Sequence, residues 1–189
     1  GEGQGSKGRE GVPLAELAAG GGAGPLHASR GRYGHEGAGL AVALDGRYGT
    51  LVSGSSDKTV RVWDLASGRG RETLVAHHGP VRCVATAGGR ILSGSSDNSV
   101  RVWEAATGDC LLHLVSHTGA VNCLQFDDAK ALTGSADGTI KLWDVAAGQC
   151  VSTILGHQGP VNALQFFYYG LASSALLSLS LSLSLAPKN

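Results

Sequence analysis

Methionine is absent from this chain of 189 residues, and aromatic residues make up only 5% of it. Because the first residue is Gly1, we expect the chain to be processed or to be a piece of a longer protein. An excess of either charge is absent too, since 15 Lys and Arg residues balance 15 Asp and Glu residues. This balance removes the electrostatic case for binding nucleic acid or an acidic membrane. We therefore expect no nucleic-acid partner and no membrane association.

Cysteines are few: the chain has four, none in a Cys-x-x-Cys spacing, which does not make a disulfide scaffold. Cys83 and Cys123 are 40 residues apart, as are Cys110 and Cys150. Such equivalent positions predict small buried hydrophobic residues, and the alternatives are paired disulfides or zinc ligands. We expect no metal and no cofactor. Nothing resembling a secretory signal stands at the N-terminus, which predicts an intracellular protein, cytoplasmic or nuclear.

A repeat dominates what is present. The three Trp residues, Trp63, Trp103 and Trp143, follow one another at intervals of 40 residues. They stand near the ends of the segments SGSSDKTVRVWD, SGSSDNSVRVWE and TGSADGTIKLWD. The segments HHGPV, HTGAV and HQGPV recur with the same period, and Gly34-His35 begins a looser first unit. A period of this length indicates structural units that stack on one another.

Each unit is predicted to contain four short antiparallel strands. In the second unit the strand sequences are VRCVATA, ILSGS, SVRVW and CLLHLVSH. The pairs Asp57-Lys58, Asp97-Asn98 and Asp137-Gly138 predict two-residue hairpin turns between the second and third strands. A four-stranded sheet of about 40 residues cannot bury both of its faces alone. The units are therefore expected to pack face to face.

These units resemble the WD-repeat family of β-propellers, named for the Trp-Asp pair seen here as Trp63-Asp64 and Trp143-Asp144. The second unit has Trp103-Glu104 instead. The resemblance implies an all-β propeller with three complete four-stranded blades and the start of a fourth, an incomplete ring. The implied blades are residues 34–76, 77–116, 117–156 and, in part, 157–166 of the propeller region 34–166. It also implies a rigid, non-catalytic platform for protein or peptide partners, and we expect the chain to be part of a larger propeller protein.

The resemblance further implies a buried hydrogen-bond network of Asp, His, Ser or Thr, and Trp in each blade. A hydrolase would use a similar Ser-His-Asp set. The recurrence of the set at one period, once with Thr, favours a structural role and argues against a small-molecule substrate. The expected sets are His35, Ser53, Asp57 and Trp63; His77, Ser93, Asp97 and Trp103; and His117, Thr133, Asp137 and Trp143.

The spacing within the units is similar to that of F-box/WD-repeat substrate receptors of ubiquitin ligases and of some organelle-division adaptors. Substrate recognition in such a ligase is the alternative function, although no F-box is visible; a propeller enzyme is a further alternative. Related propellers often bind partners on the top face. By motif, the corresponding residues here are Ser56, Arg82, Ser96, Asn122, Ala136 and Asn162. Of these, only Arg82 has the fork of donors that suits a phosphate group.

The two ends of the chain depart from the repeat. Residues 1–33 are rich in glycine and are predicted to be disordered. Residues 167–189 form a tail rich in Leu and Ser, in which Leu177 and Leu183 replace the Asp and Trp of a fourth network. We interpret SLSLSLSL as an alternative exon, a retained intron or a gene-model artefact. The alternatives are a membrane span and a half-buried edge strand.

Overall fold

The computed structural model of the protein describes residues 34–167 and 178–180. Three four-stranded antiparallel sheets, the blades, follow one another along the chain, and in each the strands pair in sequence order. The first blade contains β1 (Gly39–Asp45), β2 (Thr50–Ser55), β3 (Thr59–Asp64) and β4 (Gly70–Val75). The second contains β5 (Val81–Ala87), β6 (Arg90–Ser95), β7 (Ser99–Glu104) and β8 (Cys110–Val115). The third contains β9 (Val121–Phe126), β10 (Lys130–Ser135), β11 (Ile140–Asp144) and β12 (Gln149–Ile154). The predicted all-β fold with three complete four-stranded units is confirmed.

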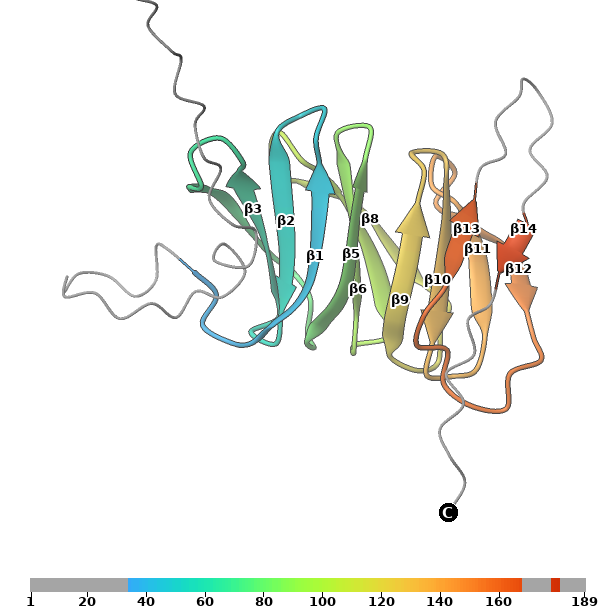
Figure 1. Ribbon diagram of the computed structural model, residues 1–189. Helices are drawn as coiled ribbons and strands as arrows, with labels where there is room; N and C mark the ends of the chain where they lie inside the picture. The colour runs from blue at the N-terminus through green and yellow to red at the C-terminus, as the bar shows by residue number, and fades with distance from the viewer. Residues whose placement is uncertain (1–33, 168–177, 181–189) are drawn as a thin grey trace, which may run out of the picture.

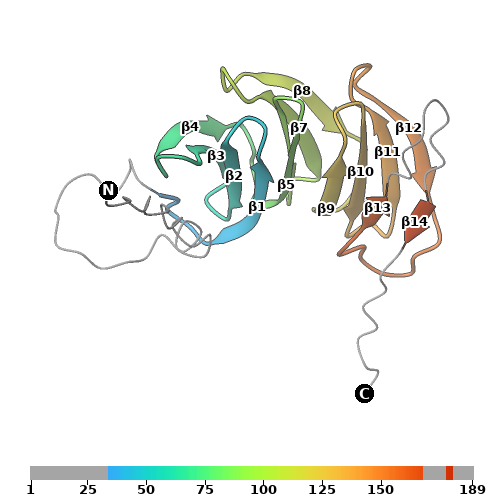
Figure 2. The ribbon, with the colours of Figure 1, turned by 45° about the horizontal axis from the view of Figure 1, so that its top comes forward.

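The blades stand side by side in an open arc (Figure 1). Figure 2 shows the first strands of the blades, β1, β5 and β9, along one side of the arc, and the last strands, β4, β8 and β12, along the other. The first strands form the inner wall, and the last strands form the outer rim. Within the described residues, the sheets do not close into a ring.

A separate two-stranded sheet follows the third blade. It pairs β13 (Gln165–Phe167) with β14 (Ser178–Ser180) in antiparallel register. Three residues of SLSLSLSL therefore form a strand that pairs with the beginning of the fourth unit. The other predictions for the ends concern residues 1–33, 168–177 and 181–189, which lie outside the described residues. No helix in the described part of the chain is long and apolar enough to span a membrane.

The apolar core lies between neighbouring blades. One side of each interface consists of alternating residues of the third strand and a Leu of the fourth strand. These residues pack against the first two strands and the Trp of the next blade. The first of these interfaces contains Val52, Val60, Val62 and Leu74 against Val81, Val84, Ile91 and Trp103. The second contains Leu92, Val100, Val102 and Leu114 against Val121, Leu124, Ala131 and Trp143. A single blade leaves these faces bare, so stacking is what buries them.

The turn between the second and third strands is longer than the sequence predicts. It spans three residues, such as 56–58, rather than two. The N–H group of Lys58 donates to the carbonyl oxygen of Ser55 at 3.2 Å. Lys58 is left-handed, with φ of 71°, as are Asn98 at 69° and Gly138 at 78°. The two-residue prediction is wrong because only the residue after the Asp adopts positive φ, which is typical of a three-residue hairpin loop.

The four cysteines are free, and their burial differs within each pair. Cys83 is buried and Cys123 is half-buried, and burial raises the pKa of the Cys123 thiol to about 11. Cys110 begins β8 on the outer rim and is exposed. The prediction that all four are buried hydrophobic residues is therefore wrong for Cys110, because no strand in the described part of the chain pairs with the outer edge of β8.

Candidate functional site

The network of the second blade joins four side chains from four places in the blade. Trp103 donates its Nε1–H to Ser93 Oγ at 2.8 Å. Ser93 Oγ lies 2.8 Å from His77 Nε2, and His77 Nδ1 lies 2.9 Å from Asp97 Oδ2. Because an indole nitrogen only donates, the Ser93 hydroxyl donates its own hydrogen to His77 Nε2. His77 is then neutral, and its Nδ1–H donates to the Asp97 carboxylate.

The first and third blades repeat this geometry with small differences. The structure brings together all the residues that the sequence predicts for the three sets. In the first blade the distances are 2.8 Å from Trp63 Nε1 to Ser53 Oγ, 2.7 Å from Ser53 Oγ to His35 Nε2 and 3.0 Å from His35 Nδ1 to Asp57 Oδ2. In the third blade they are 2.8 Å from Trp143 to Thr133, 2.7 Å from Thr133 to His117 and 2.8 Å from His117 to Asp137.

Each network fastens the segment that enters a blade. The His lies before the first strand, the hydroxyl in the second strand, the Asp in the following turn and the Trp in the third strand. The Asp carboxylate also accepts the backbone N–H group of the residue after the His. For Asp97 this donor is His78, at 2.8 Å, and for Asp137 it is Thr118, at 2.9 Å. The network therefore fixes the entering segment against the second and third strands.

A second hydroxyl belongs to each network and is missed by the sequence reasoning. Thr59, Ser99 and Thr139 each donate their hydroxyl to Oδ1 of the Asp two residues earlier at 2.6 Å. Ser95 and Ser135 add a further bond each, from their hydroxyls to the carbonyl oxygens of Gly79 and Gly119. The signal for these residues was the same period of 40 residues, because the hydroxyl after the Asp recurs in SSDKT, SSDNS and SADGT.

Burial and hydrogen bonding set the charges of the networks. Burial lowers the pKa of His77, although the hydrogen bond to Asp97 opposes this change, and His117 behaves in the same way. Burial raises the pKa of Asp57, but the hydrogen bonds it accepts outweigh this and lower the pKa to about 2. The same balance holds the pKa of Asp97 well below its usual range. At neutral pH the networks of the second and third blades thus combine a neutral His with an ionised Asp.

The Ser-His-Asp order resembles that of a hydrolase, but its geometry does not expose a nucleophile. Ser93 and Thr133 are fully buried, and each oxygen already accepts the indole N–H group. A nucleophile has to reach the substrate carbon, and this oxygen is buried and bonded to the indole N–H group. In residues 34–167 and 178–180, no three His, Cys, Asp or Glu side chains are placed to hold a metal ion. The arrangement holds chain segments together.

The predicted top-face residues form a row across neighbouring blades. Arg82 donates from Nε to Ser96 Oγ at 2.5 Å and from Nη1 to Asn122 Oδ1 at 3.5 Å. Asn122 donates from Nδ2 to Asn162 Oδ1 at 3.1 Å. Ala136 is exposed beside this row on the third blade, but no side-chain bond joins it. The row therefore links the second and third blades to the start of the fourth unit.

The first blade has a different residue at the top-face position that Arg82 occupies in the second blade. Pairing of Gly39 with Ser55 and of Val81 with Ser95 makes Leu40 the counterpart of Arg82. Ser56 is half-buried, and Leu40 is exposed. Sequence reasoning missed Leu40 because the residue numbers of the His and the hydroxyl residue differ by 18 in the first unit and by 16 in the later units. The only signal was this difference in spacing.

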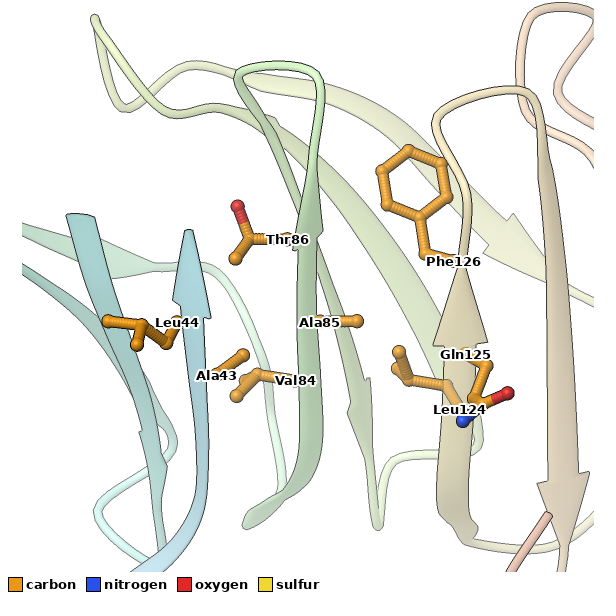
Figure 3. Close-up of a pocket in the computed structure, with 8 residues that line it drawn as sticks. All are labelled: Ala43, Leu44, Val84, Ala85, Thr86, Leu124, Gln125 and Phe126. Carbon is orange, nitrogen blue, oxygen red and sulfur yellow. The ribbon is translucent and has the colours of Figure 1, made fainter. Parts of the chain in front are cut away.

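A pocket on the inner wall was also not predicted. It has a volume of about 420 Å³ and lies along β1, β5 and β9 (Figure 3). Its lining residues are Ala43, Leu44, Val84, Ala85, Thr86, Leu124, Gln125 and Phe126. The small side chains of Ala43 and Ala85 leave room between the inner strands, and this was its only sequence signal.

Comparisons with known proteins agree with this architecture. The family model described as "WD domain, G-beta repeat" matches residues 29–64, 69–104 and 108–144, which is more than half of the chain. Mitochondrial division protein 1 of Mycosarcoma maydis is 62% identical over 37 residues, covering 20% of this chain and 4% of that protein. Pre-mRNA-splicing factor PRP46 of Candida glabrata is 40% identical over 62 residues, covering 32% and 14%. The chain thus spans only a small part of the length of these curated relatives.

Two solved structures of computationally designed proteins share the fold. Ika4 matches with a TM-score of 0.67 and 32% identity over 77% of this chain and 93% of that chain. Ika8 matches with a TM-score of 0.66 and 36% identity over 71% of this chain and 42% of that chain. Three repeated blades, their networks and these matches lead to one conclusion: the chain belongs to the WD-repeat family, whose repeats generally form non-enzymatic scaffolds for protein–protein interactions.

Proposed function

We propose that this chain is a non-catalytic scaffold for protein or peptide partners and acts as part of a larger WD-repeat propeller protein. One observation carries the proposal. A buried hydrogen-bond network stabilises each of the three blades, and polar side chains on the top face of the blades are accessible to a partner. A rigid support holds contact residues in place before a partner arrives, which reduces the entropy lost on binding. We further propose that the protein is intracellular, in the cytoplasm or the nucleus.

The top-face row is the proposed partner surface. Arg82, Asn122 and Asn162 hold one another through side-chain hydrogen bonds, so their donors and acceptors are already oriented. Ser56, Ser96 and Ala136 complete this surface. Exposed Arg and amide side chains suit backbone carbonyls and carboxylates of a partner protein.

The alternative role of substrate receptor in an F-box-type ubiquitin ligase finds less support. A phosphopeptide receptor of that kind needs several guanidinium groups on one surface. At the level of Arg82, the neighbouring blades carry Leu40, Asn122 and Asn162. The enzyme alternative finds little support either, because the hydroxyl of each network is buried and bonded to the indole N–H group of a Trp. We therefore advance the scaffold role alone.

Crosslinking in cells tests the proposed function. The 189-residue chain would carry an affinity tag, and crosslinked proteins would be identified by mass spectrometry for the wild type, Arg82→Ala and Arg71→Ala. Arg71 is an exposed residue of β4 on the outer rim, so its variant is the matched control. We expect a set of proteins that the wild type and Arg71→Ala capture and that Arg82→Ala loses. A set unchanged by Arg82→Ala would rule out the top face as the partner surface.

A further inference from the structure

We propose that the inner wall formed by β1, β5 and β9 binds an extended peptide with an apolar side chain two to three residues from a Lys or Arg. This inference rests on the proposed scaffold function and names the chemistry of one partner. The surface begins two residues beyond Arg82 along β5, at Val84, and runs away from the top face. It is thus a second surface, distinct from the polar row.

The apolar part of the surface is the pocket of about 420 Å³. Figure 3 shows Ala43 facing Val84 between β1 and β5, while Ala85 lies on the side of β5 that faces β9. Leu124 and Phe126 form the wall on β9. Two small residues among larger apolar neighbours make an indentation that a side chain from a partner fills. An aliphatic or aromatic side chain is the group that gains most from leaving water here.

The backbone of the wall favours an extended partner. β1, β5 and β9 each stand at the end of their sheet, with one long edge paired to β2, β6 or β10. The opposite edge presents N–H and C=O groups that make no ladder within the three described blades. Such an edge binds an extended peptide through main-chain hydrogen bonds, while pockets select its alternate side chains. A helical partner would not offer its backbone in this way.

Negative charge adjoins the apolar part. A second pocket, of about 590 Å³, shares Leu44 and Thr86 with the first and extends to the ends of the inner strands. Its charged lining residues are Asp45, Asp127, Asp128 and Arg47, three carboxylates against one guanidinium. Asp45 Oδ1 accepts the N–H group of Arg47 at 3.0 Å, which leaves Oδ2 without a partner in the described part of the chain. This charge favours a cationic side chain in the partner.

The distance between the apolar pocket and the acidic pocket sets the spacing between the apolar and the cationic side chain of the peptide. Leu124 lies on β9 and Asp127 follows the end of that strand, three residues later. Val84 and Ala87 are their counterparts on β5. At about 3.3 Å per residue, the two positions are roughly 7–10 Å apart. A peptide that runs along the strands therefore places its apolar and cationic side chains two to three residues apart.

Fluorescence anisotropy with defined peptides tests the inference. The probe is a labelled ten-residue peptide of Ser and Thr with one Phe and one Arg two residues apart, which places both side chains on one face of the extended peptide. It is titrated with the 189-residue chain. We expect saturable binding, weakened about fivefold or more when the Arg is replaced by Glu or the Phe by Ser. Absence of saturable binding, or equal affinity for the Glu peptide, would overturn the inference.

Variants of the wall locate the binding. Asp45→Asn combined with Asp128→Asn removes two charges without changing shape, and Asn suits the positive φ of 82° at Asp128. We expect about a fivefold loss of affinity for the Arg peptide. Asp109→Asn removes one carboxylate at an exposed turn of the second blade outside the pocket, and it should bind as the wild type does. Equal binding by the double variant and the wild type would count against the inference.

The two proposals fail in different ways. If crosslinked partners depend on Arg82 while the peptide does not bind, the scaffold function stands and the inner-wall inference falls. If the peptide binds the inner wall and Arg82→Ala changes no captured protein, the inner wall stands and the top-face assignment falls. A further variant, Ala85→Leu, fills the indentation and should abolish peptide binding while leaving Arg82-dependent capture unchanged.

Discussion

The interior interfaces and the two ends of the arc contain equivalent residues in different surroundings. On one face, Leu74 and Leu114 are 3% and 4% exposed, whereas Ile154, at the same position of the third blade, is 40% exposed. On the other face, Val84 and Leu124 are 9% and 8% exposed, whereas Val42 is 47% exposed. Pairing with Ser53, Ser93 and Thr133 shows that these three residues are counterparts. Burial of an apolar residue thus depends on the neighbouring blade.

The hydrogen-bond networks behave differently from the apolar faces. Their distances hardly change between an end blade and an interior blade: His35 lies 2.7 Å from Ser53, and His77 lies 2.8 Å from Ser93. Each network is complete within one blade, while each apolar core needs two. Stability is then a sum of blade contributions and interface contributions, as in other repeat proteins. The following substitutions separate the two contributions.

The largest expected effect comes from the interior interface. Leu114→Ala should lower the free energy of unfolding by about 2–5 kcal/mol, because it removes buried methyl groups and leaves a cavity. Ile154→Ala, at the same position of the third blade, should cost about 1 kcal/mol or less, because its side chain is already partly in water. Urea unfolding followed by Trp fluorescence measures both values. Equal costs would mean that another element covers the third blade in solution.

The networks give the next largest effect. Ser93→Ala should cost about 1–3 kcal/mol, because it leaves the indole N–H of Trp103 and the Nε2 of His77 without their shared partner. Ser53→Ala in the first blade should cost about as much, since each network is complete within its blade. Ser152→Ala, at an exposed position of β12, is the matched control and should be neutral. A much smaller cost for Ser53→Ala than for Ser93→Ala would show that the network depends on the neighbouring blade.

Acid should destabilise the blades in two steps. His77 and His117 have a lowered pKa in the folded protein, so their contribution is complete above the unfolded value of 6.5 and is lost as pH falls below it. Asp57, lowered from 3.8 to about 2, adds a second loss as pH falls through that range. Thermal unfolding across pH 2–8 measures both steps.

The histidine step has a matched control. His77→Asn should lower stability at neutral pH and reduce the pH dependence below 6.5, because one buried titrating group is gone. His78→Gln removes the adjacent, exposed histidine and should leave the pH profile unchanged. A profile that is flat between pH 5 and 7 in the wild type would contradict the neutral, buried state assigned to these histidines.

The networks were predictable from sequence because their chemistry repeats at one spacing. A His, a hydroxyl, an Asp and a Trp at constant intervals restrict the arrangement strongly, since a buried indole N–H group requires an acceptor. The role of the Ser99 hydroxyl in the network was not predicted, because Ser and Thr are common next to turns. Their recurrence at one period is therefore a weaker signal than the recurrence of Trp103. The three-residue length of the turn was not predicted, because Asp-Lys and Asp-Asn fit hairpin loops of two and of three residues equally well. Only the backbone φ angles distinguish the two loop types.

Features that depend on neighbouring blades were the hardest to predict. The amino-acid sequence of β1 does not show that Val42 is exposed, because its counterpart in β5, Val84, is also a Val and is buried. The inner-wall pocket likewise arises from three strands that are 40 residues apart in sequence and adjacent only after the blades stack. The exposure of Cys110 follows from its place on the outer rim, which the spacing of cysteines does not reveal.

The smallest expected effect concerns the uncovered face of the first blade. Val42→Thr should change the free energy of unfolding by no more than about 0.5 kcal/mol, because the side chain already meets water. Val84→Thr, its interior counterpart, should cost about 1 kcal/mol or more, because the hydroxyl enters an apolar interface. Urea unfolding of both variants makes the comparison. If Val42→Thr costs as much as Val84→Thr, a further element must cover the first blade, and the end face would then be energetically equivalent to an interior one.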